Sequence, residues 1–513
     1  MILRAFLTVG ALTGMSRVLG FLRDISIASF FGTSVFADAF VMAFRLPNLF
    51  RRLFAEGAYT AAFVPIYAST LAEKGQEEAT LFANRSSAVL TIFLSFLSIL
   101  AILFMPWIIK VIAPGFVEDQ SKFDLTVSLS RIMFVYLLFM ALTAHLSGIL
   151  NSHKKFAVAA AAPVILNLVF LIALLVVIPL FYSSVYVLAF AVSVAGLAQF
   201  LLVFFAVCRI PVKLAVVKPT IDGSVKKLFK LMGPGLVTGG AQQLNLIVGS
   251  AIASMQAGAA SYLYYADRVY QLPLGLVGVA LGVVLLPQLS SLFRSKDQEK
   301  ANNLMNSGLE LALLFTLPAT AALLVIAEPV VIGLFERGAF DRASSSATAA
   351  ALMAYAIGLP SFVLAKVMAP GFFAQQNTKT PMYYALWTIG LNLILALAFG
   401  FYWGFVGIAL ATSLAGWLNV FLLAGGLYKR GLWRWSQHLL LQACKLVLCS
   451  SVMASLLHWL APIFGRWLGE SPFDKILHLT VLVGIGIVSF FFLTIVTKTT
   501  SLARLRTQLA KKG

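Results

Sequence analysis

The chain has 513 residues, of which 60% are hydrophobic and 11% are charged, and its mean hydropathy is +0.94. A soluble domain carries about 45–50% apolar and about 25% charged residues, so this composition excludes a soluble globular protein. Long uninterrupted apolar runs also exclude a transmembrane β-barrel, whose strands alternate over about 10 residues. The net charge of +19 therefore has to be distributed over the two sides of a membrane.

Apolar runs of about 20 residues are long enough to cross a bilayer as helices. The runs between polar breaks predict an all-α polytopic membrane protein, and we expect the first run to be a retained span. The cations outside the runs lie mostly on the side that holds both termini, which predicts that both termini are cytoplasmic. The fourteen predicted transmembrane helices lie near residues 6–31, 36–65, 87–110, 125–150, 157–181, 185–208, 229–256, 260–289, 303–334, 346–373, 381–402, 404–428, 437–462 and 476–497.

The sequence repeats itself weakly after 222 to 226 residues. Leu46-Pro47 recurs as Leu272-Pro273, the run QEEA at 76–79 recurs as QEKA at 298–301, and Asn167 recurs as Asn392. Six helices per copy give both copies the same orientation, which predicts two parallel-repeat lobes around a central cavity. The predicted division is an N-lobe at 1–208, a basic cytoplasmic linker at 209–228, a C-lobe at 229–428, two extra helices at 429–497 and a basic tail at 498–513.

Charged side chains concentrate in the first two predicted helices, where hydrocarbon makes them costly by about 2.5–3.5 kcal/mol each. Five cations and three anions occur there, so acids on the same helices leave two positive charges uncompensated. Arginine offers a fork of donors that suits phosphate oxygens, which favours an anion-binding cavity for a phosphate or diphosphate. Pairing of each arginine with a nearby acid is the alternative interpretation. The eight residues are Arg17, Arg23, Asp24, Asp38, Arg45, Arg51, Arg52 and Glu56, and the eighth predicted helix adds Asp267 and Arg268.

The spacing of the charged residues and the motifs of the chain indicate which kinds of site the protein can contain. Asp38, Arg45 and Arg52 follow one another at seven-residue intervals, which places them on one helical face, and Arg17 and Asp24 share the same interval. Three cysteines and five histidines show no metal-ligand spacing, and no nucleotide-binding loop or catalytic constellation occurs. We therefore expect a protein that is not an enzyme and needs no metal or cofactor.

Several motifs resemble those of the MurJ (MviN) family of bacterial lipid II flippases, which belongs to the wider MOP exporter superfamily. They are MSRVLGFLRD at 15–24, ADAF at 37–40, FRLPN at 44–48, RRLFAEG at 51–57, YYADR at 264–268 and APGF at 369–372. The resemblance implies a multi-pass protein of the bacterial cytoplasmic (inner) membrane. It also implies alternating-access transport of the undecaprenyl-diphosphate-linked peptidoglycan precursor from the cytoplasmic to the outer leaflet, and hence a role in cell wall biogenesis.

The resemblance also implies roles for particular residues. The family's cavity arginines fall on Arg17, Arg23, Arg51 and Arg268, with Asp38 and Glu56 at matching positions and Arg45 where some relatives have lysine. With Arg52, which the charge pattern adds, these form the predicted substrate-binding set. The last two helices of the family form a groove for the lipid tail. Predicted helices 7 and 11 contain no Asp or Glu, so the family's sodium site is not expected here.

The expected partners are lipid II and membrane lipids, with cell-wall synthesis enzymes as further candidates, and nucleic acid is not expected. We expect a monomer. Three other functions remain open at this stage: a polysaccharide-lipid flippase or a cation-coupled drug antiporter of the same superfamily, and a membrane scaffold for wall-synthesis enzymes. A drug antiporter would favour acidic cavity residues, because it has to hold cations.

Overall fold

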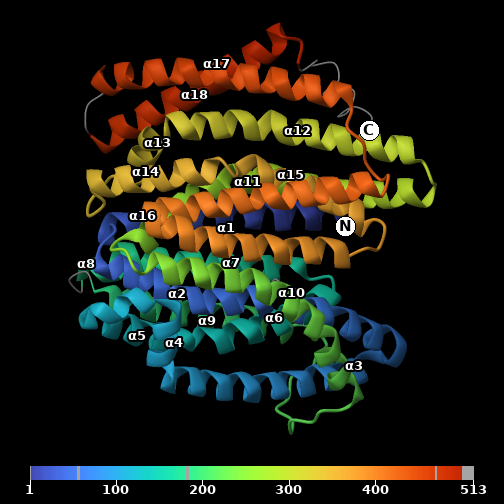
Figure 1. Ribbon diagram of the computed structural model, residues 1–513. Helices are drawn as coiled ribbons and strands as arrows, with labels where there is room; N and C mark the ends of the chain where they lie inside the picture. Colours follow the sequence, from blue (N-terminus) through green and yellow to red (C-terminus); the bar gives the residue numbers. More distant parts are fainter. Residues whose placement is uncertain (1, 55–57, 181–183, 468–470, 500–513) are drawn as a thin grey trace. The chain divides into compact units, whose positions relative to one another are not determined.

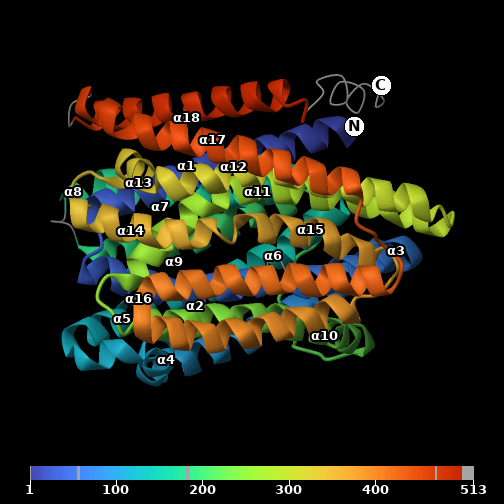
Figure 2. The same ribbon diagram turned by 45° about the horizontal axis from the view of Figure 1, so that its top comes forward.

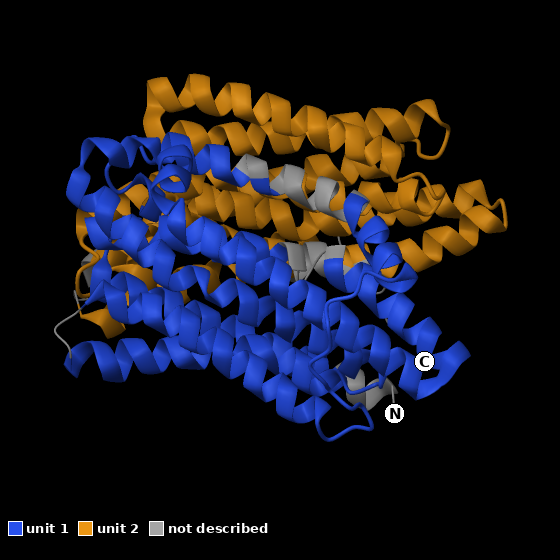
Figure 3. Ribbon diagram, turned by 90° about the horizontal axis from the view of Figure 1, so that it is seen from below, with its two compact units in different colours: residues 1–261 blue, residues 262–513 orange. Residues whose placement is uncertain are grey.

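The computed structural model describes residues 2–54, 58–180, 184–467 and 471–499, and within these ranges all regular structure is helical (Figure 1). The predicted all-α fold is therefore confirmed for the described part of the chain. Helices are the expected solution for apolar runs in lipid, because a helix satisfies its own backbone N–H and C=O groups. By packing, the chain divides into two compact units, residues 1–261 and 262–513 (Figure 3).

Unit 1 contains the first ten α-helices, one 3-10 turn and one π-helical turn. α10 belongs to this unit by packing, where it lies against α3, whereas the sequence repeat assigns the same helix to the C-lobe. The bounds are α1 Ile2–Phe31, α2 Val35–Phe54, α3 Ala58–Leu103, α4 Met105–Ile112, η1 Pro114–Glu118, α5 Gln120–Phe134, α6 Tyr136–Ser152, α7 Phe156–Ile172, η2 Ala173–Val177, α8 Ile178–Leu180, α9 Val185–Val207 and α10 Gly223–Ala253.

Unit 2 contains the remaining helices, apart from the first residues of α11. In this unit α17 packs on both α12 and α18, and Figures 1 and 2 show α17 and α18 side by side. The bounds are α11 Ala259–Arg294, α12 Gln298–Val325, α13 Ala327–Phe335, α14 Arg342–Ala356, α15 Leu359–Phe373, α16 Lys379–Lys429, α17 Gln437–Trp467 and α18 Pro472–Val496.

Two of the long helices are broken by glycines in conformations that side chains rarely adopt. Gly75 has φ 83° within α3, and Gly404 has φ 58° within α16. Only glycine adopts such angles without steric cost, so each position ends one helical stretch and starts another. The break at Gly404 lies where the sequence predicted a boundary between two helices, at 402–404. The second predicted helix ended at residue 65, whereas the first stretch of α3 continues past that residue to the break at Gly75.

Nine helical stretches in the described residues are long and apolar enough to cross a membrane. Four long helices are not among them: α1, α2, α10 and α11. Of these, α1, α2 and α11 carry the charges that the sequence singled out, and α10 begins with three lysines and contains two glutamines. Three of these four helices are thus ones in which a polar site was predicted.

Each unit has its own apolar core. In unit 1 the core joins α1, α2, α5, α6, α7 and α9 around aromatic side chains, including Phe40, Tyr136 and Phe170. In unit 2 it joins α11, α12, α15 and α16 with the start of α17, and Trp433 is buried in it. Each core packs the helices of its own unit against one another.

Candidate functional site

Arg23 of α1 lies in a buried polar cluster between α1 and α7. Its Nη2 and Nε donate to Asp24 Oδ1 at 2.7 and 3.0 Å, and its Nη1 donates to Asn167 Oδ1 at 3.1 Å. The guanidinium also stands 5.3 Å from the ring centre of Phe170. Asn167 in turn donates to the carbonyl oxygen of Ser16 at 2.8 Å. The cluster holds the ion pair of Arg23 and Asp24 at a fixed position inside a helix pair.

The other arginines predicted in unit 1 lie in different surroundings. Arg17 is exposed, and none of the described residues gives it a hydrogen bond or ion pair. Arg45 is half-buried and donates from Nη1 to the carbonyl oxygen of Leu246 at 3.3 Å and to the hydroxyl of Ser250, both on α10. These two contacts orient the guanidinium of Arg45 toward α10.

Arg51 and Arg52, at the end of α2, are both half-buried. Arg51 donates from Nε to Asn48 Oδ1 at 3.0 Å. Arg51 also lines a cavity of about 370 Å³ inside unit 1. The lining of this cavity also includes polar residues, such as Thr60 and Asn151, and several alanines. Glu56, the remaining acid predicted for this region, lies outside the described residues.

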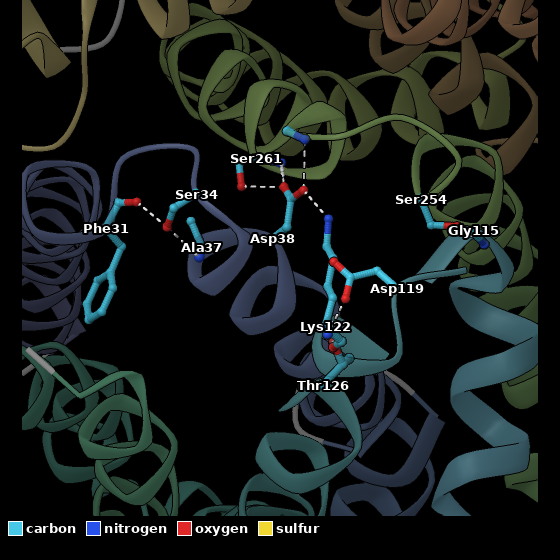
Figure 4. Close-up of polar contacts among 11 residues, drawn as sticks. Phe31, Ser34, Ala37, Asp38, Gly115, Asp119, Lys122, Thr126, Ser254 and Ser261 are labelled. Atoms are coloured by element: carbon cyan, nitrogen blue, oxygen red, sulfur yellow. Dashed lines mark hydrogen bonds and ion pairs between the residues drawn. The ribbon is translucent and has the colours of Figure 1, made fainter. Parts of the chain in front are cut away.

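Asp38 of α2 is fully engaged within unit 1 (Figure 4). Its side chain accepts from Lys122 Nζ at 2.8 Å, from the backbone N–H groups of Gly258 and Ser261 at 2.9 and 3.0 Å, and from the Ser261 hydroxyl at 2.7 Å. Only 1% of Asp38 and 6% of Lys122 is exposed. Asp38 thus joins α2 to α5 and to the first turn of α11, where backbone N–H groups favour a negative charge.

A second connection lies beside Asp38. The backbone N–H of Gly115 in η1 donates to Ser254 Oγ at 3.0 Å (Figure 4). A Cβ at Gly115 would come within 2.4 Å of the Ser254 carbonyl oxygen, so only glycine fits this approach. The turn between α10 and α11 is therefore fixed to the α4–α5 connection by one hydrogen bond and a close approach of the two backbones.

Arg268 lies on α11 in unit 2. Its guanidinium carbon stands 4.6 Å from the ring centre of Tyr264, one helical turn earlier, and the side chain is half-buried. The neighbouring Asp267 accepts a hydrogen bond from Gln271. Tyr270 is buried and stacks on Tyr355 with ring centres 5.5 Å apart. α11 therefore presents a cation on an aromatic surface, which is one way to hold an arginine in an apolar environment.

Two isolated cations in the predicted spans serve helix ends. Arg131 donates from Nε to the carbonyl oxygen of Ile102, next to the end of α3, at 3.1 Å. Lys445 donates from Nζ to the carbonyl oxygen of Thr497, the C-cap residue of α18, at 3.1 Å. The final carbonyls of a helix lack partners in the helix and carry partial negative charge, so a cation there is stabilising. Their presence in spans needs no ligand.

An apolar cavity of about 270 Å³ lies within unit 2. It is lined by α12, α17 and α18, and its lining includes Phe315, Leu457, Leu482 and Phe490. No charged side chain lines it. A cavity of this kind favours an apolar occupant over water.

The sequence missed Lys122 and the role of Asn167. Lys122 falls in a segment predicted as a loop, so it was counted only as a topology signal, and Asp38 is 84 residues away. Asn167 was noticed only because it recurs as Asn392. That recurrence was one available signal. The other was the position of Asn167 inside an apolar helix, where an amide has to find a hydrogen-bond partner.

Comparisons with known proteins agree along nearly the whole chain. The family described as lipid II flippase MurJ matches residues 27–476. A probable lipid II flippase MurJ of Rhizobium tropici is 40% identical and covers 100% of this chain and 97% of its own length. A lipid II flippase MurJ of Burkholderia cenocepacia is 38% identical, over 92% of this chain and 93% of its own.

Solved structures give the same result for the fold. A structure of lipid II flippase MurJ in an inward closed conformation aligns with a TM-score of 0.80 at 27% identity, over 95% of this chain and 98% of that chain. An inward-facing multidrug resistance MATE transporter of the MOP superfamily aligns with a TM-score of 0.68 at 13% identity, over 83% of this chain. At that identity the second likeness concerns the fold alone.

Proposed function

The chain belongs to the MurJ family of lipid II flippases, and we propose that it moves lipid II across the membrane by binding the diphosphate with the arginines of α1, α2 and α11. It is a transporter and not an enzyme. Its substrate is the lipid-linked peptidoglycan precursor, so the protein acts in cell wall biogenesis. The observation that carries the proposal is the buried Arg23 cluster in a chain 40% identical to a probable flippase over its whole length.

The proposed site consists of Arg17, Arg23, Arg45, Arg51, Arg52 and Arg268, with Glu56 as an acid that balances part of their charge. Arginine forks match diphosphate oxygens in geometry and charge. Binding of the diphosphate to a net-positive cavity favours whichever state brings the arginines together, which supplies the differential affinity that a ligand-driven transition needs. We assign Asp38 to positioning within unit 1, since its carboxylate is already engaged by Lys122.

The proposed membrane arrangement has fourteen transmembrane helices in two lobes, with both termini in the cytoplasm, in the bacterial inner membrane. The basic linker at 209–228 and the tail at 498–513 then face anionic lipid on the cytoplasmic side. The repeat-based lobes, with the monomer as the working unit, would rock to expose the cavity first inward and then outward.

We further propose that α17 and α18 hold the polyprenyl tail. The supporting observation is the apolar cavity between α12, α17 and α18, which follows α18 from Leu482 to Phe491. Ten helical residues cover about 15 Å along the axis. A chain of isoprene units lying there would remain in an apolar environment while the diphosphate at its end is bound by the arginines.

Depletion and complementation test the flippase activity. Cells depleted of the native protein would receive the wild type, Arg23→Ala or Arg268→Ala at matched protein levels, and lipid II exposed on the outer leaflet would be scored. We expect both variants to lose exposure. Arg131→Ala is the matched control, because its guanidinium donates to a helix-end carbonyl and it should retain exposure. Normal exposure with both Arg23→Ala and Arg268→Ala would refute the arginine site.

The alternatives from the sequence are not favoured. A drug antiporter requires acidic cavity residues, and the one predicted cavity acid that the structure describes, Asp38, is bonded to Lys122. A scaffold role predicts that Arg23→Ala still supports growth. Contact with wall-synthesis enzymes is compatible with the flippase but is not needed for it.

A further inference from the structure

The segment that leads into α17 is fastened to α12 by side-chain amides. Gln298, Asn302 and Asn306 lie at four-residue intervals, so they share one face of α12. Gln298 Nε2 donates to the carbonyl oxygen of Gly431 at 2.8 Å, and the backbone N–H of Arg434 donates to Asn302 Oδ1 at 2.7 Å. We call these contacts and those of Asn306 the strap clasp.

Asn306 is the buried member of the strap clasp. Its Nδ2 donates to the Arg434 carbonyl oxygen at 3.2 Å, and its Oδ1 accepts from Trp433 Nε1 at 3.0 Å. Trp433 is 1% exposed, so this bond satisfies an indole that would otherwise be buried without a partner. Because α17 begins at Gln437, the strap clasp sets where α17 starts relative to α12.

The other end of the hairpin is fastened by ion pairs. Lys475, in the first turn of α18, lies 3.0 Å from Glu336, and Glu336 also lies 3.6 Å from Arg342. We call these three residues the acid clasp. Beside it, a Cβ at Gly333 of α13 would come within 2.9 Å of Leu479 Cβ, so the backbones of α13 and α18 approach closely. The acid clasp sets where α18 starts relative to α13.

The apolar cavity lies between the two clasps. Protein interiors are close-packed, and a void among mobile apolar helices tends to close because its walls lack contacts. Polar contacts fasten the two ends of the hairpin to α12 and α13, and the cavity lies between them, around Leu482 and Gly486.

We propose that the strap clasp and the acid clasp are positioning elements that keep this groove open for a long polyprenyl chain, and thereby make binding depend on tail length. The inference rests on the proposed function of the groove. Inside a bilayer, lipid tails are as apolar as leucine, so no hydrophobic force drives a tail into the groove. Affinity then depends on how well the walls fit the chain, and wall position becomes the specificity determinant.

Unit 1 contains a matched clasp that leads to no hairpin. Asn84, which precedes Asn306 by the repeat distance of 222 residues, donates to the Lys213 carbonyl oxygen at 3.0 Å and accepts from the Ala215 N–H at 3.3 Å. The same side chain thus fastens the segment after α9 in unit 1 and the segment after α16 in unit 2. Asn84→Leu therefore removes equivalent contacts without touching the groove.

Binding of two probes to the full-length chain in nanodiscs tests the inference. Undecaprenyl diphosphate and geranyl diphosphate share a headgroup and differ in tail length. We expect the wild type to prefer the long probe by roughly tenfold. Asn306→Leu and Lys475→Met should each reduce this preference to about twofold or less while leaving geranyl diphosphate affinity unchanged. Asn84→Leu and Lys475→Arg should keep the preference.

The outcomes separate the two levels of the proposal. If the wild type prefers the long probe and both clasp variants retain that preference, the clasps do not position the groove, and the tail site stands without them. If the wild type shows no preference, the tail site itself is wrong. Loss of geranyl diphosphate binding in a clasp variant would indicate general damage and would refute a role confined to the tail.

Discussion

Replacing Asp38 by asparagine tests whether the contacts of Asp38 hold unit 1 together. The substitution keeps the shape of the side chain and removes its charge, which leaves the Lys122 ammonium, 6% exposed, without its 2.8 Å counter-charge. Breaking a buried pair in this way costs about 3–5 kcal/mol. The new amide nitrogen also takes the place of one carboxylate oxygen and cannot accept, so either the Gly258 N–H at Oδ2 or the Ser261 N–H at Oδ1 loses its acceptor.

The magnitude follows from these contacts. We expect Asp38→Asn to lower the free energy of unfolding by about 4 kcal/mol. Lys122→Met should cost less, because the Asp38 carboxylate keeps two backbone donors and the Ser261 hydroxyl. In the double variant no buried charge is left alone, so the two effects should be non-additive by about 2 kcal/mol or more.

Denaturant unfolding of the purified chain in detergent, arranged as a double-mutant cycle, measures this coupling. Asp124→Asn is the control, because Asp124 lies on the same helix as Lys122 but is exposed and bonds only Gln120 among the described residues. It should change the unfolding free energy by less than about 0.5 kcal/mol. Additive effects of Asp38→Asn and Lys122→Met would refute the reasoning.

Three further predictions concern unit 2. Lys445→Met should destabilise the α17–α18 hairpin by about 1 kcal/mol, because it removes the cation at the Thr497 carbonyl; Lys445→Arg should not, as thermal unfolding would show. Burial raises the pKa of Glu336, but hydrogen bonds and nearby charges, including Lys475, outweigh it and hold that pKa below its ordinary value. The ionised Glu336 therefore stabilises the folded protein fully above about pH 4.5, and this stabilisation is lost as the pH falls through the lower pKa of the folded state. The unfolding free energies of the wild type and Glu336→Gln should therefore differ at neutral pH and converge in acid. Gly486→Leu should fill the apolar cavity and weaken binding of undecaprenyl diphosphate but not of geranyl diphosphate; equal weakening of both would argue against a tail site.

Periodicity and composition predicted the helices well because each helix depends on its own residues. The break at Gly404 was predicted from local sequence, and glycine is the residue that local chemistry requires there. Conformation at such points is decided within a few residues. Helical segments were therefore the most predictable feature of the chain.

Side-chain surroundings were predicted less well, because they depend on which helix covers which face. Arg17 and Asp24 share a seven-residue spacing, yet Arg17 is exposed while Asp24 is 2% exposed. The difference arises because Asp24 lies beside Arg23, whose guanidinium is held by Asn167 of α7. Spacing along one helix carries no information about a neighbour 144 residues away.

The engagement of Asp38 strengthens the argument for an external anion. The sequence placed five cations and three anions in the first two predicted helices, which leaves a surplus of two positive charges. Lys122 lies outside that count and neutralises Asp38, so the surplus over the remaining residues rises to three. A cavity that collects these arginines would hold more uncompensated charge than the sequence alone indicated, and a diphosphate of about two negative charges would remove most of it.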